Sequence, residues 1–366
     1  MKNENAYLVD LRDLRNTAQL VMGNNATEIM TATSAVRIAV VIPYYNGSKF
    51  IERALASVYR QTLPAHEIIV VDDGSDAEER VFIANLASTG RFALLHQNNG
   101  GQGSARNAGV KAATADYICF LDQDDFYLDH HNAVLAEAIP HEGARFGWVY
   151  GEVQEADGDG HICRTAIVKA YSATPKTNIY NLLAHDMYIL PSASLVSKTA
   201  FTAIEGFDEQ FTGYEDDDLF LRMFRAGYTN TFIDSAVVVW CINTASTSFS
   251  LRMSTSRHRY FEKLRNNFKD NDVRGIHIMR DCLIPRFEPY FVEESRRAVL
   301  RNSNDIDAKL DILNSYRDVV LAHPSVAAQH KRRLSILAHL INQKSPRLLR
   351  LTSRLFRYKL KVRYQT

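Results

Sequence analysis

The stretch FLDQDDFYLD, residues 120–129, crowds the carboxylates of Asp122, Asp124 and Asp125 directly after the apolar run ADYICF. Like charges this close repel each other and raise each other's pKa values. The cluster is therefore either an ordinary acidic turn in water or a place where something positive binds. Hard divalent cations such as Mg²⁺ and Mn²⁺ prefer carboxylate and phosphate oxygens, so the second interpretation implies a metal site.

A second acidic run, Glu215 to Asp218 in YEDDDLFLRM, comes immediately before a helical stripe that includes Leu219 and Met223. Acidic side chains stabilise helix N-termini through the helix dipole. Helix capping alone therefore explains this run when it is considered by itself.

Several other chemistries are disfavoured by the spacing of the residues. In GQGSAR, Arg106 occupies the place of the third glycine of a dinucleotide-binding fingerprint, and the stretch does not follow the first predicted strand. A phosphate loop is also excluded, because Lys111 does not directly follow Gly109. No G-x-S-x-G elbow is present, so acyl transfer has little support. The adjacent His130 and His131 would not face one metal from a regular helix, and we expect both on the surface.

What remains is a nucleotide diphosphate held by a divalent cation. A short D-x-D turn at a strand end offers one or two oxygen ligands. A cation there neutralises the charge that develops on a leaving diphosphate.

Short apolar runs alternate with helical patterns in the first part of the chain. We expect strands at 37–43, 67–75, 92–96 and 116–122, and helices at 49–61, 77–88 and 103–113, the last capped by Ser104. This alternation predicts an α/β fold with a mainly parallel sheet covered on both faces. Ligands gather at the carboxyl ends of such strands, so the polar ends PYYN, DDGS, QNNGGQGSARN and DQDD should share one edge.

The pattern changes at about residue 147. We expect a strand in GWVYGEV, a hairpin or mobile loop over 155–177, a short helix in NIYNLLAH and a strand in SASLVS. A helix follows the second acidic run, 229–242 adds more strand, and 256–366 is mostly helical. The predicted division is a leader of unclear role (1–36), an α/β domain (37–250) and a helical C-terminal region (251–366).

The composition is that of a globular chain, with 46% hydrophobic and 23% charged residues. The four cysteines form no C-x-x-C pair and resemble ordinary thiols of a reducing compartment. The N-terminus is polar, which argues against a signal peptide, and no run of about 18 apolar residues predicts a spanning helix.

A basic tail follows an acidic body. Residues 331–366 hold 11 Lys and Arg and no acid, which leaves 32 basic and 42 acidic residues in the rest of the chain. As a helix the tail would be amphipathic with a cationic face, which suits an anionic membrane surface. A helix packed on its own domain and a subunit contact are equally supported alternatives. Nucleic acid is a weaker one, because no nucleic-acid-binding motif accompanies the charge.

Six ordered motifs carry a resemblance to a known family: VIPYYN, VVDDGS, NGGQGSARNAG, FLDQDD, EGFDE and YEDDDLFLRM. Over residues 36–250 they resemble the inverting family 2 glycosyltransferases of bacterial cell-surface polysaccharide synthesis. This family has the GT-A fold, a Rossmann-like, mainly parallel sheet flanked by helices. Here a mostly helical C-terminal region follows it.

The resemblance implies roles for individual residues. Asp124 would hold Mn²⁺ or Mg²⁺, Asp122 would face the ribose or the sugar, and Asp125 would support them or contact the sugar. Asp73 would bind the base, typically uracil, although capping of the DDGS bend is an alternative. Arg106 would lie in the segment that runs past the nucleotide and sugar, or else form a surface ion pair. The substrate-binding residues implied are Pro43, Tyr45, Asn46, Asp73, Gly101, Ser104, Arg106, Asp122, Gln123 and Glu215.

Asp216 takes the place of the family's general base, which accepts the proton of the acceptor hydroxyl during a single inverting displacement. One departure concerns the metal. The family often has a histidine that reaches the metal after the last core strand, and Asn243 of WCINTASTS occupies that place. Asn is a poor ligand for these metals, so a histidine ligand is not expected.

The function implied is transfer of a hexose from a nucleotide sugar, with UDP favoured, to a glycan or lipid-linked acceptor. The enzyme would be cytoplasmic and peripheral at the inner membrane face, and an oligomer is compatible with the helical tail. A non-catalytic nucleotide-sugar or glycan-binding protein is the first alternative. A sugar nucleotidyltransferase is the second, but PYYNGSKF lacks the Gly-rich, basic loop that such enzymes carry after their first strand.

Overall fold

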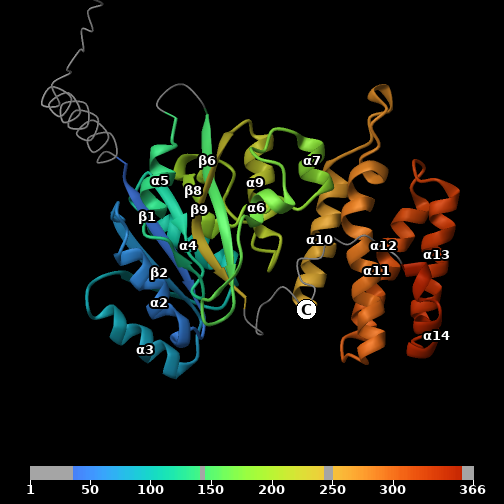
Figure 1. Ribbon diagram of the computed structural model, residues 1–366, viewed down its shortest axis with the longest axis horizontal. Coiled ribbons are helices and arrows are strands. Elements are labelled where there is room, and N and C mark those ends of the chain that lie inside the picture. Colours follow the sequence, from blue (N-terminus) through green and yellow to red (C-terminus); the bar gives the residue numbers. More distant parts are fainter. Residues whose placement is uncertain (1–35, 141–144, 243–249, 357–366) are drawn as a thin grey trace, which may run out of the picture.

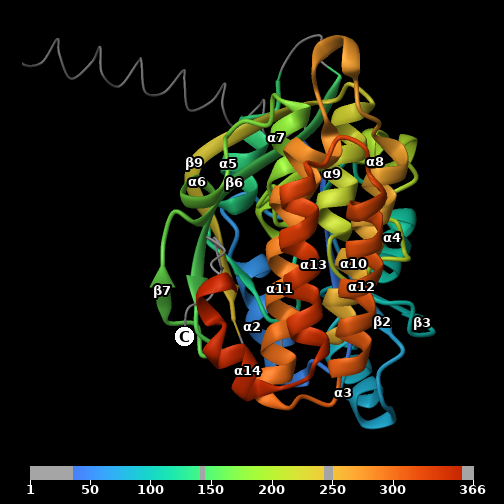
Figure 2. The same cartoon turned by 90° about the vertical axis from the view of Figure 1, so that its right-hand side faces the viewer.

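A computed structural model describes residues 36–140, 145–242 and 250–356 of the chain. It consists of a twisted sheet with helices on both faces and, beside it, a layer of long helices (Figure 1). Figure 2 shows the helical layer from its outer side.

The four strands predicted in the first part of the chain form a parallel array in the order β3-β2-β1-β4. They are β1 (Ile38–Tyr44), β2 (Glu67–Asp73), β3 (Ala93–Gln97) and β4 (Tyr117–Phe120). Every residue of β1 is buried, as expected for a continuous apolar run with helices on both sides. The helices between the strands are α2 (Ser48–Tyr59), α3 (Ala77–Ala87) and α4 (Gln102–Ala112).

Helix α4 packs unusually close to the sheet. A Cβ atom on Gly109 would lie 2.3 Å from Cγ1 of Val41 in β1, so only glycine allows this approach. The helix begins after Gly101, and Ser104 makes no capping bond; the prediction that Ser104 caps this helix was wrong. Arg106 lies on this helix and is buried.

The remaining strands extend the sheet in the order β4-β8-β6-β9-β5. Strand β8 (Ser194–Ser197) is antiparallel to β4 and to β6 (Phe146–Ala156), and β9 (Thr229–Cys241) runs parallel to β6. Strand β5 (Phe126–Tyr127) pairs with the end of β9. Strand β7 (Ile162–Arg164) pairs back onto β6, which confirms a hairpin within 155–177.

Short helices complete the sheet domain: α5 (His131–Glu137), α6 (Ile167–Tyr171), α7 (Ile179–Ala184), α8 (Lys198–Ala203) and α9 (Glu215–Arg225). The helical region contains α10 (Leu251–Asn267), α11 (Ile284–Arg301), α12 (Ile306–Ala322), α13 (Ala328–Asn342) and α14 (Pro346–Leu351). One continuous hydrophobic core runs through both parts and includes Val40 of β1, Phe220 of α9 and Phe287 of α11. Helix α10 begins next to the predicted boundary at residue 250, but no break in the core marks it.

The histidine at position 131 corrects a prediction. His131 is fully buried, stacks on Tyr127 with ring centroids 3.6 Å apart, and lies 3.3 Å from the carbonyl oxygen of Ser192. Burial lowers the pKa of His131 to about 4. It is a core residue because the sheet edge and β5 close over it, which the HH dipeptide alone does not indicate.

We expect His131 to make the fold sensitive to acid. The pKa is about 4 when folded against 6.5 for an ordinary histidine, so between these values the unfolded chain binds more protons. The stability that depends on neutral His131 is therefore fully present above about pH 6.5 and is lost as the pH drops toward 4. The free energy of unfolding should fall by about 2 kcal/mol between pH 7.5 and 5. Urea unfolding of wild type and His131→Phe at several pH values measures this. Equal pH slopes for the two chains would contradict it.

None of the helices in the described ranges is both long and apolar enough to cross a membrane.

Candidate active site

The ends of the parallel strands are joined by hydrogen bonds at one edge of the sheet. The amide N–H of Tyr45, after β1, donates to Oε1 of Gln123 at 2.9 Å, and Nε2 of Gln123 donates to the carbonyl of Tyr45 at 3.1 Å. The amide of Asn46 donates to Oγ of Ser75, after β2, at 3.0 Å. The predicted meeting of the polar strand ends is confirmed. Pro43 is buried just before them, and Tyr45 is half exposed.

Asp73 joins the ends of β2 and β3 rather than capping its own turn. Its carboxylate accepts from the amides of Gly100 and Gly101, both at 2.8 Å, and from Nε2 of Gln97 at 2.7 Å. The capping bond of the DDGS bend belongs to Asp72, which accepts from the amide of Ser75 at 3.0 Å. The capping alternative for Asp73 was therefore wrong. The carboxylate of Asp73 is fixed by the loop that leads into α4. It lies at the edge of the sheet where the parallel strands end, which we call the rim.

Arg106 is a buried cation at the centre of the site. It is 1% exposed, and its two terminal nitrogens lie 2.5 Å from Oδ1 of Asp122 and 3.0 Å from Oε1 of Glu215. Burial lowers the pKa of the guanidinium, but the two carboxylates raise it more, so Arg106 stays charged. The surface alternative for Arg106 was wrong. This residue ties the D-x-D turn to the start of α9, nearly a hundred residues later in the chain.

The three acids of the D-x-D turn have different surroundings. Asp122 pairs with Arg106, and Asp124 is half-buried. Asp125 is 2% exposed and accepts from the amide of Cys241 at 2.9 Å and from the hydroxyl of Ser192 at 3.2 Å. Burial, with Asp124 and Asp122 nearby, raises the pKa of Asp125 well above its usual value. Asp125 thus braces the turn against β9, and Arg106 supplies the first positive partner that the cluster required.

The second acidic run sits in the first turn of α9, and its members face different neighbours. Glu215 contacts Arg106 and also accepts from Gln102. Oδ1 of Asp216 accepts from the amide of Asp217 at 2.8 Å. The carboxylates of Asp217 and Asp218 are held by cations of the helical region and of α9: Arg286, Lys263 and Arg222. Glu215 therefore adjoins the rim formed by the strand ends, and Asp216 is the next residue of α9.

Two features near Asp124 were not foreseen. Arg53 of α2 donates to the carbonyls of Asp124 at 2.7 Å and Gly158 at 3.4 Å, which brings the β6–β7 turn beside the D-x-D. On that turn the exposed Asp157, Asp159 and His161 have potential ligand atoms within 4.8 Å of one another. Their sequence, DGDGH, predicts only a turn. The position Asn243, which concerned a histidine ligand, lies outside the described residues.

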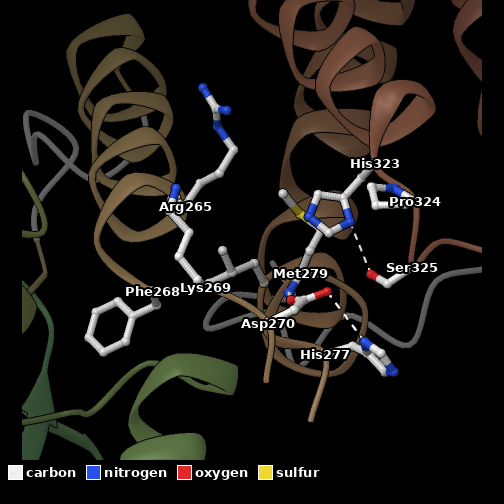
Figure 3. Close-up of a pocket in the computed structure, with 10 residues that line it drawn as sticks. Arg265, Phe268, Lys269, Asp270, His277, Met279, His323, Pro324 and Ser325 are labelled. Carbon is white, nitrogen blue, oxygen red and sulfur yellow. Dashed lines mark hydrogen bonds and ion pairs between the residues drawn. The ribbon is translucent and has the colours of Figure 1, made fainter. Parts of the chain in front are cut away.

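A cavity of about 500 Å³ lies elsewhere, between the C-terminal end of α10 and the turn before α13 (Figure 3). Its walls include Arg265, Lys269 and His323, and His277 pairs with Asp270 at its edge. Helix α10 contacts the turn before α9 through Ser256, which lies more than two helical turns before Arg265 of the cavity wall.

Two family profiles match the sheet domain. One described as "Glycosyl transferase family 2" matches residues 39–198, and one described as "N-terminal domain of galactosyltransferase" matches residues 189–239. Together they cover every rim residue and the first turn of α9.

Bacterial relatives match the same part of the chain. An uncharacterized glycosyltransferase of Rickettsia bellii is 28% identical over 203 residues, which are 55% of this chain and 29% of that protein. YwdF of Bacillus subtilis, also an uncharacterized glycosyltransferase, is 29% identical over 63% of this chain and 83% of its own length. The amylovoran biosynthesis glycosyltransferase AmsB of Erwinia amylovora is 30% identical over 53% of this chain and 65% of its own length. The match thus spans less than a third of the Rickettsia protein.

Solved structures share the fold over most of the chain. TarS 1–349 of S. aureus in complex with UDP has a TM-score of 0.57 and 16% identity, covering 88% of this chain and 93% of that one. The mannosyltransferase PcManGT of Pyrobaculum calidifontis, in complex with GDP-Man and Mn²⁺, has a TM-score of 0.50 and 18% identity, covering 89% and 96%. The ordered motifs, the sheet topology and these matches agree: the chain has the GT-A fold, and its residues 39–198 match the family 2 glycosyltransferases.

Proposed function

We propose that the chain transfers a hexose from a nucleotide sugar, with UDP as the favoured nucleotide, to a hydroxyl group of a growing cell-surface glycan. The observation that carries this proposal is the buried contact of Arg106 with both Asp122 and Glu215. It joins the rim, where a donor would bind, to the turn that carries Asp216. Relatives named for amylovoran synthesis and fold neighbours with UDP or UDP-GlcNAc support the substrate class.

The donor is assigned to the strand ends. Asp73, fixed by two backbone amides, would accept from the base, while Pro43, Tyr45 and Asn46 would line the nucleotide pocket. Gly101 and Ser104 would lie along the nucleotide, and Asp122 with Gln123 along the ribose and sugar. Arg106 would keep Asp122 and Glu215 correctly oriented, because burial strengthens its contacts with both carboxylates.

A divalent cation fits the donor set that remains at the D-x-D. Its side chains offer hard carboxylate oxygens, as Mg²⁺ and Mn²⁺ prefer, and Asp125 is already engaged by Cys241 and Ser192. Asp124 would hold the ion, with Asp122 beside it. When bound, such an ion neutralises the charge of the departing diphosphate.

Asp216 would act as the general base of an inverting displacement. It would accept the proton of the acceptor hydroxyl as that oxygen attacks the anomeric carbon from the face opposite the diphosphate. Glu215, the residue before Asp216, would contact the substrate beside the base. Arg106 and Gln102 fix the carboxylate of Glu215 at the rim.

A nucleotide-release assay tests the proposal. The full chain is incubated with a panel of UDP-, GDP- and TDP-hexoses and lipid-linked acceptors, with Mn²⁺, with Mg²⁺ or with chelator. We expect release of UDP from one donor, dependent on acceptor and metal. A chain that binds UDP-sugars but transfers none to any acceptor would favour the non-catalytic alternative. Pyrophosphate formation from UTP and a sugar phosphate would favour the nucleotidyltransferase, and absence of UDP binding would refute the site.

We propose further that α14 and the turn after it contact an anionic membrane at the cytoplasmic face. Arg347, Arg350 and Arg354 are exposed there beside Leu351, which is 84% exposed, and Leu355, which is half exposed. Basic and apolar side chains together suit an anionic lipid surface. Arg347→Glu/Arg350→Glu should lower sedimentation of the full chain with phosphatidylglycerol vesicles at least about tenfold. Unchanged partitioning would contradict this, and phosphatidylcholine vesicles are the control.

A further inference from the structure

The helical region holds the first turn of α9 at the residue next to Asp216. Asp217 is 6% exposed and forms an ion pair with Arg286 of α11, whose side chain is 1% exposed. We propose that Arg286 is a positioning residue of the transfer reaction, which fixes the first turn of α9 through Asp217 and thereby orients Asp216. This inference rests on the proposed function, since it concerns the assigned base.

The contacts of Arg286 leave Asp217 little freedom. Nη1 of Arg286 donates to the carbonyl of Leu182 at 2.9 Å. Nε and Nη2 of Arg286 donate to Oδ1 of Asp186 at 3.2 and 3.1 Å. The other oxygen of Asp217 accepts from the amide of Met187 at 3.1 Å. The planar guanidinium thus joins α11, the segment after α7 and α9 in one fixed geometry. Because the amide of Asp217 also donates to Asp216, a shift of Asp217 would move the base.

Helix α10 fixes the same turn from its other side. Tyr214, the residue before α9, has a φ of 66°, a left-handed conformation that a tyrosine keeps only when its surroundings impose it. Its hydroxyl accepts from Nε of Arg257 at 2.9 Å, and its ring stacks on Tyr260 with centroids 5.4 Å apart. The carbonyl of Gly213 accepts from Ser256 at 2.5 Å. The turn that carries Asp216 is therefore built jointly by the sheet domain and the helical region.

The charge of Arg286 matters as well as its shape. Asp186 and Asp217 both pair with it, and Asp217 directly follows Asp216 in the chain. Without the cation, the carboxylate of Asp217 would lose its positive partner directly beside the assigned base. Loss of Arg286 should therefore impair the orientation of Asp216. The rim contacts of Asp73, Arg106 and Asp122 would be unaffected.

The experiment separates kcat from KM in the nucleotide-release assay. Arg286→Gln should lower kcat about 100-fold, as expected for a misplaced catalytic group, and leave KM for the donor within about twofold. Arg286→Lys should have a higher kcat than Arg286→Gln, because lysine restores the positive charge but not the planar guanidinium with its several donors. Arg297→Gln is the matched control. It changes an arginine of the same helix whose side chain is 44% exposed and pairs with Glu293, and it should keep wild-type kcat.

Asp217→Asn tests the same contact from the other side, for the case that Arg286→Gln does not fold. Its amide nitrogen would face the guanidinium, so we expect the same fall in kcat at unchanged KM. Wild-type kcat in either folded variant, or a rise in KM that matches the fall in kcat, would overturn the inference alone. A wild-type chain that binds donor but transfers no sugar would overturn the proposed function, and this inference with it.

Discussion

Asp216→Asn should slow sugar transfer strongly while leaving the donor bound. The amide keeps the size of the carboxylate, and its oxygen can still accept from the Asp217 amide, so the start of α9 should be preserved. The amide cannot accept a proton from the acceptor hydroxyl. Loss of a general base typically lowers kcat by about 10²- to 10⁴-fold. The rate of UDP release, with the Kd for UDP from calorimetry, measures both parts of the expectation.

The same variant distinguishes catalysis from helix capping, which explained the acidic run when it was considered alone. If Asp216 only stabilised the helix N-terminus, its substitution would lower the free energy of unfolding by about 1 kcal/mol and leave kcat unchanged. Asp234→Asn is a suitable control, because Asp234 is exposed and pairs with Lys169 at the surface. Normal kcat in Asp216→Asn would remove the base assignment.

The sheet and its functional edge could be predicted because their signals are local. Unbroken apolar runs such as IAVVIP are typical of strands buried on both faces, and polar residues directly after them must lie at the carboxyl edge. The bonds between Tyr45 and Gln123 show that edge as expected. Burial of His131 could not be predicted in this way, because it depends on a strand pair formed by Phe126 with Val239, more than a hundred residues apart.

The partners of the site residues were less predictable than the residues themselves. The sequence identified the acids at 122 and 124 but assigned their positive partner to a metal alone. Arg106 became a partner only because Gly109 lets α4 approach β1. Arg53 and Arg286 carry no motif and reach the site from α2 and α11. Their roles arise from packing between distant segments, which local patterns do not encode.

Arg106→Met should be among the most destabilising substitutions in the chain. Methionine fills much of the same space, but it leaves Glu215, whose side chain is 5% exposed, and part of Asp122 without their cation. Removing one partner of a buried ion pair typically costs about 3–5 kcal/mol, mostly because the remaining charge stays buried. Urea unfolding at pH 7.5 measures the change. Arg60→Met removes an exposed pair with Asp129 and should cost less than about 1 kcal/mol.

A double variant tests the physical reason for that loss. Arg106→Met/Glu215→Gln removes the stranded charge of Glu215, and the new amide oxygen can still accept from Gln102. If the cost of Arg106→Met comes from an uncompensated buried carboxylate, the double variant should be more stable than the single one by about 1–3 kcal/mol. If the cost came only from lost packing around the arginine stem, the second substitution would recover nothing. Arg106 would then be a packing residue, and the link between the D-x-D turn and α9 would lose its electrostatic basis.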